Sequence, residues 1–250
     1  MMKISTLALV VFCILVQHRF VAKANPSINF EKPRLKKSVS LAESQFAYSE
    51  SVKQNCYVFS HHAVIEVVDP GLTGSKISIR PKDQFMSNDE LCSEKYKGRQ
   101  IFLNNKATYF WGSYRNYLFV RAADDFSDRE RFEVFNSLTG ENLWSAHRNN
   151  SKKFTLMNNG NRVSLSYSHH LKIFCNITRD KKNSCWKRLF VDYKIPDDIK
   201  LERPDCISSL RKASLSLNSE VYVFLPVMLT DLAKPRIKYL SGKATCSAAP

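Results

Sequence analysis

The chain has 250 residues, 44% of them hydrophobic, and its 38 basic and 23 acidic residues give a formal net charge of +15. It has only seven glycines and lacks a glycine-rich phosphate loop, a dinucleotide-binding fingerprint, HExxH and GxSxG, which argues against nucleotide-driven chemistry but leaves a dispersed catalytic triad open. The positive charge favours an anionic partner such as nucleic acid, anionic polysaccharide, lipopolysaccharide or lipid headgroups; a charge that serves only solubility is the alternative.

Residues 1–24 predict a cleaved secretory signal peptide. Lys3 supplies the positive N-terminal region, residues 4–16 form an apolar run, and Ala22 and Ala24 give the small-residue pattern of a cleavage site. Without this segment, 35 basic and 23 acidic residues remain, a net charge of +12. No later segment has the roughly 18 consecutive apolar residues of a transmembrane helix, so we expect none.

Residues 25–50 are mostly polar, so we expect an N-terminal arm or linker. Its basic side chains Arg34, Lys36 and Lys37 make it an auxiliary contact for an anionic ligand.

Residues 51–250 predict a β-rich domain with a possible sub-boundary near residues 196–206, because alternation of apolar and polar residues dominates them. The clearest strand covers residues 163–173 and follows an Asn159-Gly160 hairpin turn, which makes residues 152–157 its partner. A strand at residues 57–67 has apolar side chains on both faces. Further strands are expected at residues 76–80, 101–104, 108–121, 131–136, 213–225 and 236–239, and short helices are possible at residues 88–97 and 207–212.

These patterns predict an all-β fold of mainly antiparallel sheet, sandwich-like or barrel-like and stabilised by disulfides. Two turns echo one another, EVVDPGLTG at residues 66–74 and EVFNSLTG at residues 133–140, and residues 118–144 resemble one β-propeller blade in outline. However, the turns are offset by 66 residues, whereas the stretches YVFSHHAVI and SYSHHLKI are offset by 108. A tandem array should show one period, so a propeller-like arrangement is less favoured.

Six cysteines follow the predicted signal peptide, and this even number indicates three disulfides in an oxidising compartment. They are Cys56, Cys92, Cys175, Cys185, Cys206 and Cys246. Among about 15 connectivities we expect the sequential one. The absence of a CxxC pair weighs against a zinc ribbon or a thioredoxin-like centre. We therefore expect a secreted or periplasmic protein.

Four of the six histidines lie in the two SHH stretches. Strand alternation places His61 and His169 on apolar faces and turns His62 and His170 the other way. If the two strands are neighbours, His61 and His169 could bind zinc or copper with a third ligand such as His147. They could also act as acid and base in phosphodiester cleavage beside a lysine. The alternative is two hydrogen-bonded sheet histidines, and the sequence assigns no metal or cofactor.

The segment RDKKNSCWKR at residues 179–188 is the preferred ligand contact. It combines positive charges for phosphate or sulfate with an aromatic stacking face, and a Cys175–Cys185 disulfide would hold its shape. The ligand-binding candidates are Lys181, Lys182, Trp186, Lys187 and Arg188. The alternative is a solvated hairpin tip whose Trp186 packs inward.

Three further signals remain. The aromatic residues Tyr109, Phe110, Trp111, Tyr114, Tyr117 and Phe119 could line a sugar-binding groove, but their presence on both strand faces favours a core. The acidic run Asp124, Asp125, Asp128 and Glu130 offers oxygens to calcium but lacks the spacing of a calcium loop, which favours a solvated loop. Glycosylation sequons begin at Asn149 and Asn176, which matters only in a eukaryotic source.

Together these features predict a secreted or periplasmic binding protein for an anionic surface or polymer, namely anionic polysaccharide, lipid headgroups or nucleic acid. A histidine-centred secreted hydrolase of nuclease type, or a metalloprotein, is the alternative. The sequence therefore leaves enzymatic activity open, with a non-enzymatic role favoured. A third hypothesis is contact with an unidentified protein through an open sheet edge.

Overall fold

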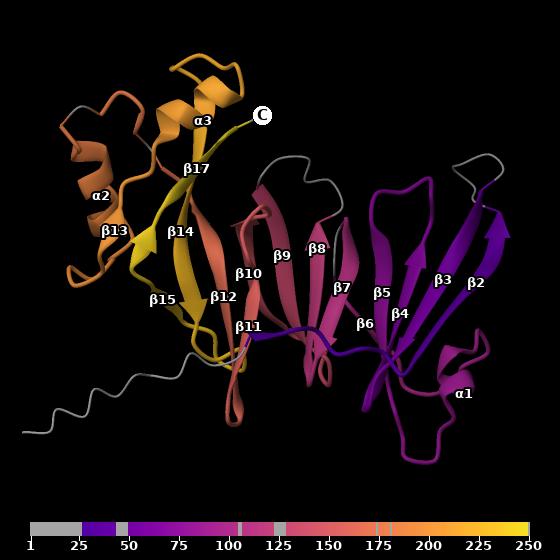
Figure 1. The fold of residues 1–250 in the computed structure, drawn as a ribbon. Helices are drawn as coiled ribbons and strands as arrows, with labels where there is room; N and C mark the ends of the chain where they lie inside the picture. The colour runs from indigo at the N-terminus through magenta and orange to yellow at the C-terminus, as the bar shows by residue number, and fades with distance from the viewer. Residues whose placement is uncertain are drawn as a thin grey trace, which may run out of the picture.

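The computed structural model describes residues 27–43, 50–104, 107–122, 129–173, 175–180 and 182–249. The predicted signal peptide, the acidic residues Asp124, Asp125 and Asp128, and Lys181 lie outside the described residues. Strands dominate, and two large antiparallel sheets stand side by side (Figure 1). The predicted all-β, mainly antiparallel and disulfide-stabilised class is therefore confirmed.

The first sheet has five strands. In spatial order they are β2 (Leu35–Glu43), β3 (Ser51–Val58), β4 (His62–Val68), β5 (Ser75–Pro81) and β6 (Ile101–Phe102). The expectation of an arm or linker is wrong for residues 35–43, which form the edge strand β2 paired with β3. Lys37 shares one side of β2 with Leu35 and Val39, and this interruption weakened the alternation that would have marked a strand.

The central strands of this sheet are buried on both faces, in agreement with the apolar residues on both sides of residues 57–67. On one face Val64 and Ile79 pack with Val120 of the second sheet. On the other face Val58 and Ile65 pack with residues of α1 (Asn88–Cys92) and its disulfide. The sheet is thus fixed from both sides.

The expected strand at residues 57–67 is two strands joined by a tight turn. β3 ends at Val58, β4 begins at His62, and the Phe59 N–H donates to the His62 carbonyl oxygen at 2.8 Å. No Asn-Gly or similar pair marks this turn, so the alternation continues through it in the sequence. His61 is consequently exposed in the turn, whereas His62 is buried. The expected strand at residues 108–121 also turns, at Arg115, where φ is +53°.

The second sheet has ten strands. The main path runs β1 (Ser27–Ile28), β11 (Thr155–Asn159), β12 (Arg162–Leu171), β10 (Asn142–Asn149), β9 (Arg129–Asn136), β8 (Tyr117–Ala122) and β7 (Thr108–Tyr114). β14 (Val221–Leu229) pairs with β12 and also with β15 (Ile237–Tyr239) and β17 (Thr245–Ala248). β10 and β12 share one ladder pair, Arg148↔His169, so two halves of the sheet meet at a single point. One core unites these halves, with Phe132 of β9 against Tyr167 of β12.

Two helices and a short parallel strand pair gather at one end of β12 and β14 (Figure 1). They are α2 (Ser184–Asp192), α3 (Cys206–Lys212), β13 (Leu201–Glu202) and β16 (Gly242–Lys243). α1 and α3 lie where short helices were possible. α2 was not predicted, and β14 begins only at Val221, so the expected strand at residues 213–225 is too long. One core cluster contains Leu189 and Val223, which lie on opposite sides of residues 196–206, together with Cys206 at the end of that range.

The expected sequential disulfides are present. They join β3 to α1, the segment after β12 to α2, and α3 to β17, as Cys56–Cys92, Cys175–Cys185 and Cys206–Cys246. Such cross-links fit an oxidising, extracellular compartment. Within the described chain, none of the helices has the length and apolar character needed to span a membrane.

The two echoing turns are hairpins near opposite ends of β7. In the β4–β5 turn, Gly74 has φ +83°, and a Cβ there would lie 2.6 Å from the Thr108 backbone nitrogen at the start of β7. At the β9–β10 turn, the Ser137 N–H donates to the carbonyl oxygen of Asn116, just beyond the end of β7. The echo therefore reflects shared turn chemistry, and the two copies do not occupy matching places.

Candidate functional site

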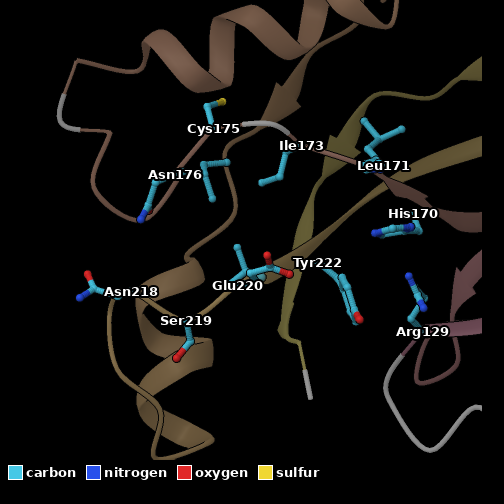
Figure 2. Close-up of a pocket in the computed structure, with 13 residues that line it drawn as sticks. Arg129, His170, Leu171, Ile173, Cys175, Asn176, Asn218, Ser219, Glu220 and Tyr222 are labelled. Carbon is cyan, nitrogen blue, oxygen red and sulfur yellow. The ribbon is translucent and has the colours of Figure 1, made fainter.

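An open cleft of about 590 Å³ lies beside the ends of β12 and β14. Its walls are formed by Arg129 and residues 170–173, 175–177 and 218–222 (Figure 2). These segments come from β9, β12, the loop after β12 and the start of β14. The cleft thus occurs where the ladder between β12 and β14 has ended, since its last pair is Leu171↔Val223.

Strand alternation explains which side chains reach the cleft. On β12, Leu165, Tyr167 and Leu171 enter the cores, so Ser168 and His170 occupy the opposite face. His170 is paired with Phe224 of β14, which places Tyr222 on the same face two residues earlier. The His170 ring lies 5.1 Å from the Tyr222 ring and 5.6 Å from the Phe224 ring, measured between centroids.

Arg129 brings positive charge to this aromatic group. Its guanidinium carbon lies 4.7 Å from the Tyr222 ring centroid, a cation–π contact. A guanidinium has five N–H donors in one plane, so it can stack on a ring and donate to an oxyanion at its edge. Lys172 also lines the cleft, and Figure 2 shows Tyr222 between Arg129 and the carboxylate of Glu220. Among the lining residues that the structure describes, two are cationic and one is anionic.

His170 is a neutral member of the site at neutral pH. Burial lowers its pKa to about 4, and the positive charge of Arg129 and the nearby rings of His147 and His169 act in the same direction. The His147 ring lies 6.0 Å from the His170 ring between centroids. His170 can therefore accept or donate one hydrogen bond as a neutral imidazole, while Arg129 and Lys172 supply the charge.

His169 belongs to the core side of β12. Its Nδ1 shares a hydrogen bond of 3.1 Å with the Tyr167 hydroxyl, which also accepts from Trp144 Nε1 at 3.3 Å. Burial, with His147 nearby, lowers the His169 pKa to about 4, and burial raises the Tyr167 pKa. This neutral network satisfies buried polar atoms, which matches the alternative of a hydrogen-bonded sheet histidine.

His61 and His169 do not form a site together. The turn that carries His61 belongs to the five-stranded sheet, whereas His169 lies in the ten-stranded sheet, so the condition of neighbouring strands is not met. The assignment of faces is also wrong at His61, because the chain turns there. No group of three or more His, Cys, Asp or Glu side chains suited to a metal ion occurs among the residues that the structure describes.

The segment at residues 179–188 offers charge without a stacking face. Trp186 is 8% exposed and packs against Phe190, with 5.7 Å between ring centroids, so the inward-packing alternative is the one observed for this ring. Lys182, Lys187 and Arg188 are exposed, and Arg188 pairs with Asp192 at 3.4 Å.

Asp180 explains why this segment is helical. Its carboxylate accepts the backbone N–H groups of Ser184, Cys185 and Trp186 at 2.8–3.2 Å, which are the unpaired donors of the first turn of α2. Although burial acts to raise the Asp180 pKa, these hydrogen bonds hold it below its usual value. Asp180 is four residues before Ser184, the first residue of the helix, and so lies outside the usual capping position; this is why the sequence did not indicate α2.

The expected auxiliary contact lies on the edge strand β2 and just before it. Arg34 donates to Ser60 Oγ at 3.2 Å, Lys36 Nζ lies 5.4 Å from the Tyr57 ring centroid, and Lys37 pairs with Asp89 at 3.4 Å. Lysines on an edge strand also discourage pairing with another chain. Protection of the edge strand would therefore explain these basic residues without a ligand.

Five of the six residues of the aromatic cluster divide between two cores and do not line one groove, and Tyr109 is partly buried. Phe119, with Trp111, Tyr114 and Tyr117 at its margin, belongs to one core, and Phe110 packs against another. Glu130, from the acidic run, is buried and accepts from Arg148 Nε at 2.7 Å, so it serves an ion pair within the sheet.

Comparison of the chain with protein-family models, with curated proteins and with solved structures finds no significant match. The functional reading therefore rests on the cleft itself. Sequence reasoning missed Arg129, Glu220 and Tyr222 because Arg129 lies far from the other two in the chain and the three share no local motif. The one signal that pointed to the cleft was the polar face of β12, where His170 lies.

Proposed function

We propose that the protein is a secreted binding protein whose cleft holds an anionic group of a polysaccharide, a lipid surface or another polymer. The main support for this proposal is that the Arg129 guanidinium stacks on the Tyr222 ring at the cleft. Stacking orients the guanidinium before a ligand arrives, so less side-chain freedom is lost on binding.

Three properties support this proposal. The cleft volume of about 590 Å³ falls in the range of roughly 300–1,000 Å³ usual for ligand sites. Without the predicted signal peptide the chain has an excess of 12 positive charges, which favours encounter with anions. Its three disulfides suit an oxidising environment outside the cell.

The test compares two arginines that both stack on a tyrosine. Arg129→Ala should weaken binding about tenfold or more, because a charge-assisted hydrogen bond is worth about 1.5–3 kcal/mol. Arg115→Ala is the matched control: Arg115 stacks on Tyr114 at 5.6 Å, in the β7–β8 turn and outside the cleft lining. Binding to heparin, hyaluronan, double-stranded DNA and anionic lipid vesicles would be measured at several salt concentrations. Equal losses in both variants, or no binding to any probe, would contradict the proposal.

Charge reversal at Lys182, Lys187 and Arg188 sharpens this test. These exposed side chains lie outside the cleft lining. Their reversal should flatten the salt dependence while lowering affinity less than Arg129→Ala does. A larger loss of affinity than that caused by Arg129→Ala would indicate that the ligand binds at α2 and the turn before it.

A histidine-centred hydrolase of nuclease type remains the second candidate, now with a different pair. His147 and His170, with 6.0 Å between ring centroids, lie on one sheet face with Arg129 near His170. With a pKa of about 4, His170 is neutral at neutral pH and could accept a proton, but as a weaker base than an ordinary imidazole, and Arg129 could stabilise a phosphorane. Cleavage of RNA that is lost in both His147→Ala and His170→Ala would favour this function; intact RNA after prolonged incubation would remove it.

A further inference from the structure

We propose that Asn176, at the rim of the cleft, carries an N-linked glycan and that the second sequon, at Asn149, does not. This inference rests on the secretion that forms part of the proposed function, and on a eukaryotic secretory pathway. It does not depend on which anion the cleft binds.

The two sequons have the same local geometry. Asn176 Oδ1 accepts the N–H of Thr178 at 3.1 Å and its hydroxyl at 2.5 Å. Asn149 Oδ1 accepts the N–H of Ser151 at 3.0 Å and its hydroxyl at 2.6 Å. In both turns the amide oxygen is engaged by the third residue of the sequon, so the local chain alone does not distinguish them.

Burial distinguishes them. Asn149 is 3% exposed at the end of β10, where it pairs in register with Arg129 of β9. An oligosaccharide on its Nδ2 would have to occupy packed protein interior, which is filled as densely as an organic crystal. A folded chain with a glycan at Asn149 is therefore excluded by the packing.

Asn176 has the opposite environment. Its neighbour Ile177 is 1% exposed and belongs to the core beneath α2, and this anchor leaves Asn176 exposed. Figure 2 shows the Asn176 amide at the outer rim, on the side away from Tyr222 and Arg129. The preceding residue is cross-linked as Cys175–Cys185, and Thr178 Oγ1 also donates to the Leu217 carbonyl oxygen at 2.9 Å. The disulfide and the buried Ile177 thus hold the turn in place, and its Asn176 amide faces solvent.

The chemistry needs a glycosyl donor of the lipid-linked oligosaccharide class. A bond forms between Asn176 Nδ2 and C1 of the first sugar, while the bond from C1 to the lipid pyrophosphate breaks. The amide loses one proton to a base of the transferase, and the lipid pyrophosphate leaves with the bonding electron pair. No oxidant or reductant takes part. The product stands at the mouth of the cleft, since Asn176 is also one of its lining residues.

The experiment expresses the full chain with its own leader in mammalian cells and examines protein from the medium. Electrophoretic mobility and intact mass are compared before and after peptide N-glycosidase treatment. We expect the mass of one glycan in the wild type, its loss in Asn176→Gln and Thr178→Ala, and its retention in Thr178→Ser. Ser151→Ala, which removes the second sequon and keeps the buried Asn149, should change nothing.

The outcomes separate this inference from the function of the cleft. The inference is overturned if the secreted protein has no glycan, or if its glycan survives Asn176→Gln and disappears in Ser151→Ala. Neither result bears on anion binding, which the comparison of Arg129→Ala with Arg115→Ala tests separately. Chain retained in the cell without a glycan overturns secretion and the inference together. A glycosylated protein that binds no anionic probe supports the inference and contradicts the proposed function of the cleft.

Discussion

The two SHH stretches have the same sequence but lie in different structural environments. The first lies at the turn from β3 to β4, where His62 is 1% exposed between the two sheets. The second lies on β12, where His170 lines an open cleft with Arg129 and Tyr222. The difference teaches that alternation assigns a side chain to a face of a strand, while the neighbouring strands decide whether that face is core or site.

The environments of the two histidines show how neighbours act. His62 stacks on Phe59, with 5.2 Å between ring centroids, and its Nε2 shares a hydrogen bond of 3.1 Å with Ser113 Oγ of β7. His170 contacts Tyr222 and Phe224 through its ring and faces the cleft. The first is a packing residue that ties one sheet to the other, and the second is available to a ligand.

The largest effect should come from the disulfides beside the two stretches. Replacing Cys56 and Cys92 by alanine opens a loop with a sequence separation of 36, worth about 4 kcal/mol of unfolding free energy from loop closure. The pair Cys175 and Cys185 closes a loop with a separation of 10, worth about 3 kcal/mol. Urea unfolding of the two double variants measures both. An equal or greater loss for the shorter loop would show that local packing near the cleft outweighs loop closure.

Replacing the second histidine of each stretch by alanine should give the next largest difference in unfolding free energy between the two regions. His62→Ala leaves a cavity and removes one of the two hydrogen bonds of the Ser113 hydroxyl, which keeps its bond to the Tyr117 carbonyl oxygen, and it should cost about 3 kcal/mol of unfolding free energy. His170→Ala should cost less than about 1.5 kcal/mol, because its ring is half-buried beside open solvent. The exposed His61→Ala is the control, with a change within about 0.5 kcal/mol. Similar losses for His62 and His170 would remove the distinction between packing residue and site residue.

The pH dependence of stability should give a smaller effect than the loss of the His62 side chain. Burial, with a smaller contribution from His61, lowers the His62 pKa to about 4, whereas an unfolded histidine has a pKa of about 6.5. Below pH 6.5 the unfolded chain binds a proton that the folded chain does not, so stability falls as pH drops towards 4. Above pH 6.5 both states are neutral at this residue, and its effect vanishes.

The measurement compares wild type with His62→Phe, which keeps a ring and cannot titrate. Between pH 7.5 and pH 5 the wild type should lose about 2 kcal/mol more than the variant, from the linkage of one depressed pKa. Parallel pH profiles for the two proteins would mean that His62 is protonated in the folded state at pH 5.

Much of the fold was predictable because it depends on local chemistry. Alternation at residues 163–173 and the turn Asn159-Gly160 indicated β12 and its hairpin with β11, and the structure contains both. The even cysteine count predicted three disulfides, and the sequential pairing expected among about 15 connectivities is the one in the structure. The turn at Phe59 and the helix α2 were missed, because the first has no turn residues and the second is capped by Asp180 from outside the usual position.

The sequence by itself determined the all-β class, the even cysteine count that indicates three disulfides, and the polar face of β12, since each depends on residue type and short spacing. It left the disulfide pairing open, and the structure shows the expected sequential one. Only the tertiary structure decided that Trp186 is core, that His61 and His169 lie in different sheets, and that Arg129, His170 and Tyr222 meet in one cleft. The physical reason is that these outcomes depend on which strands pair and where their ladders end. Pairing between distant segments is set by the free energy of the whole core, and no local pattern records it.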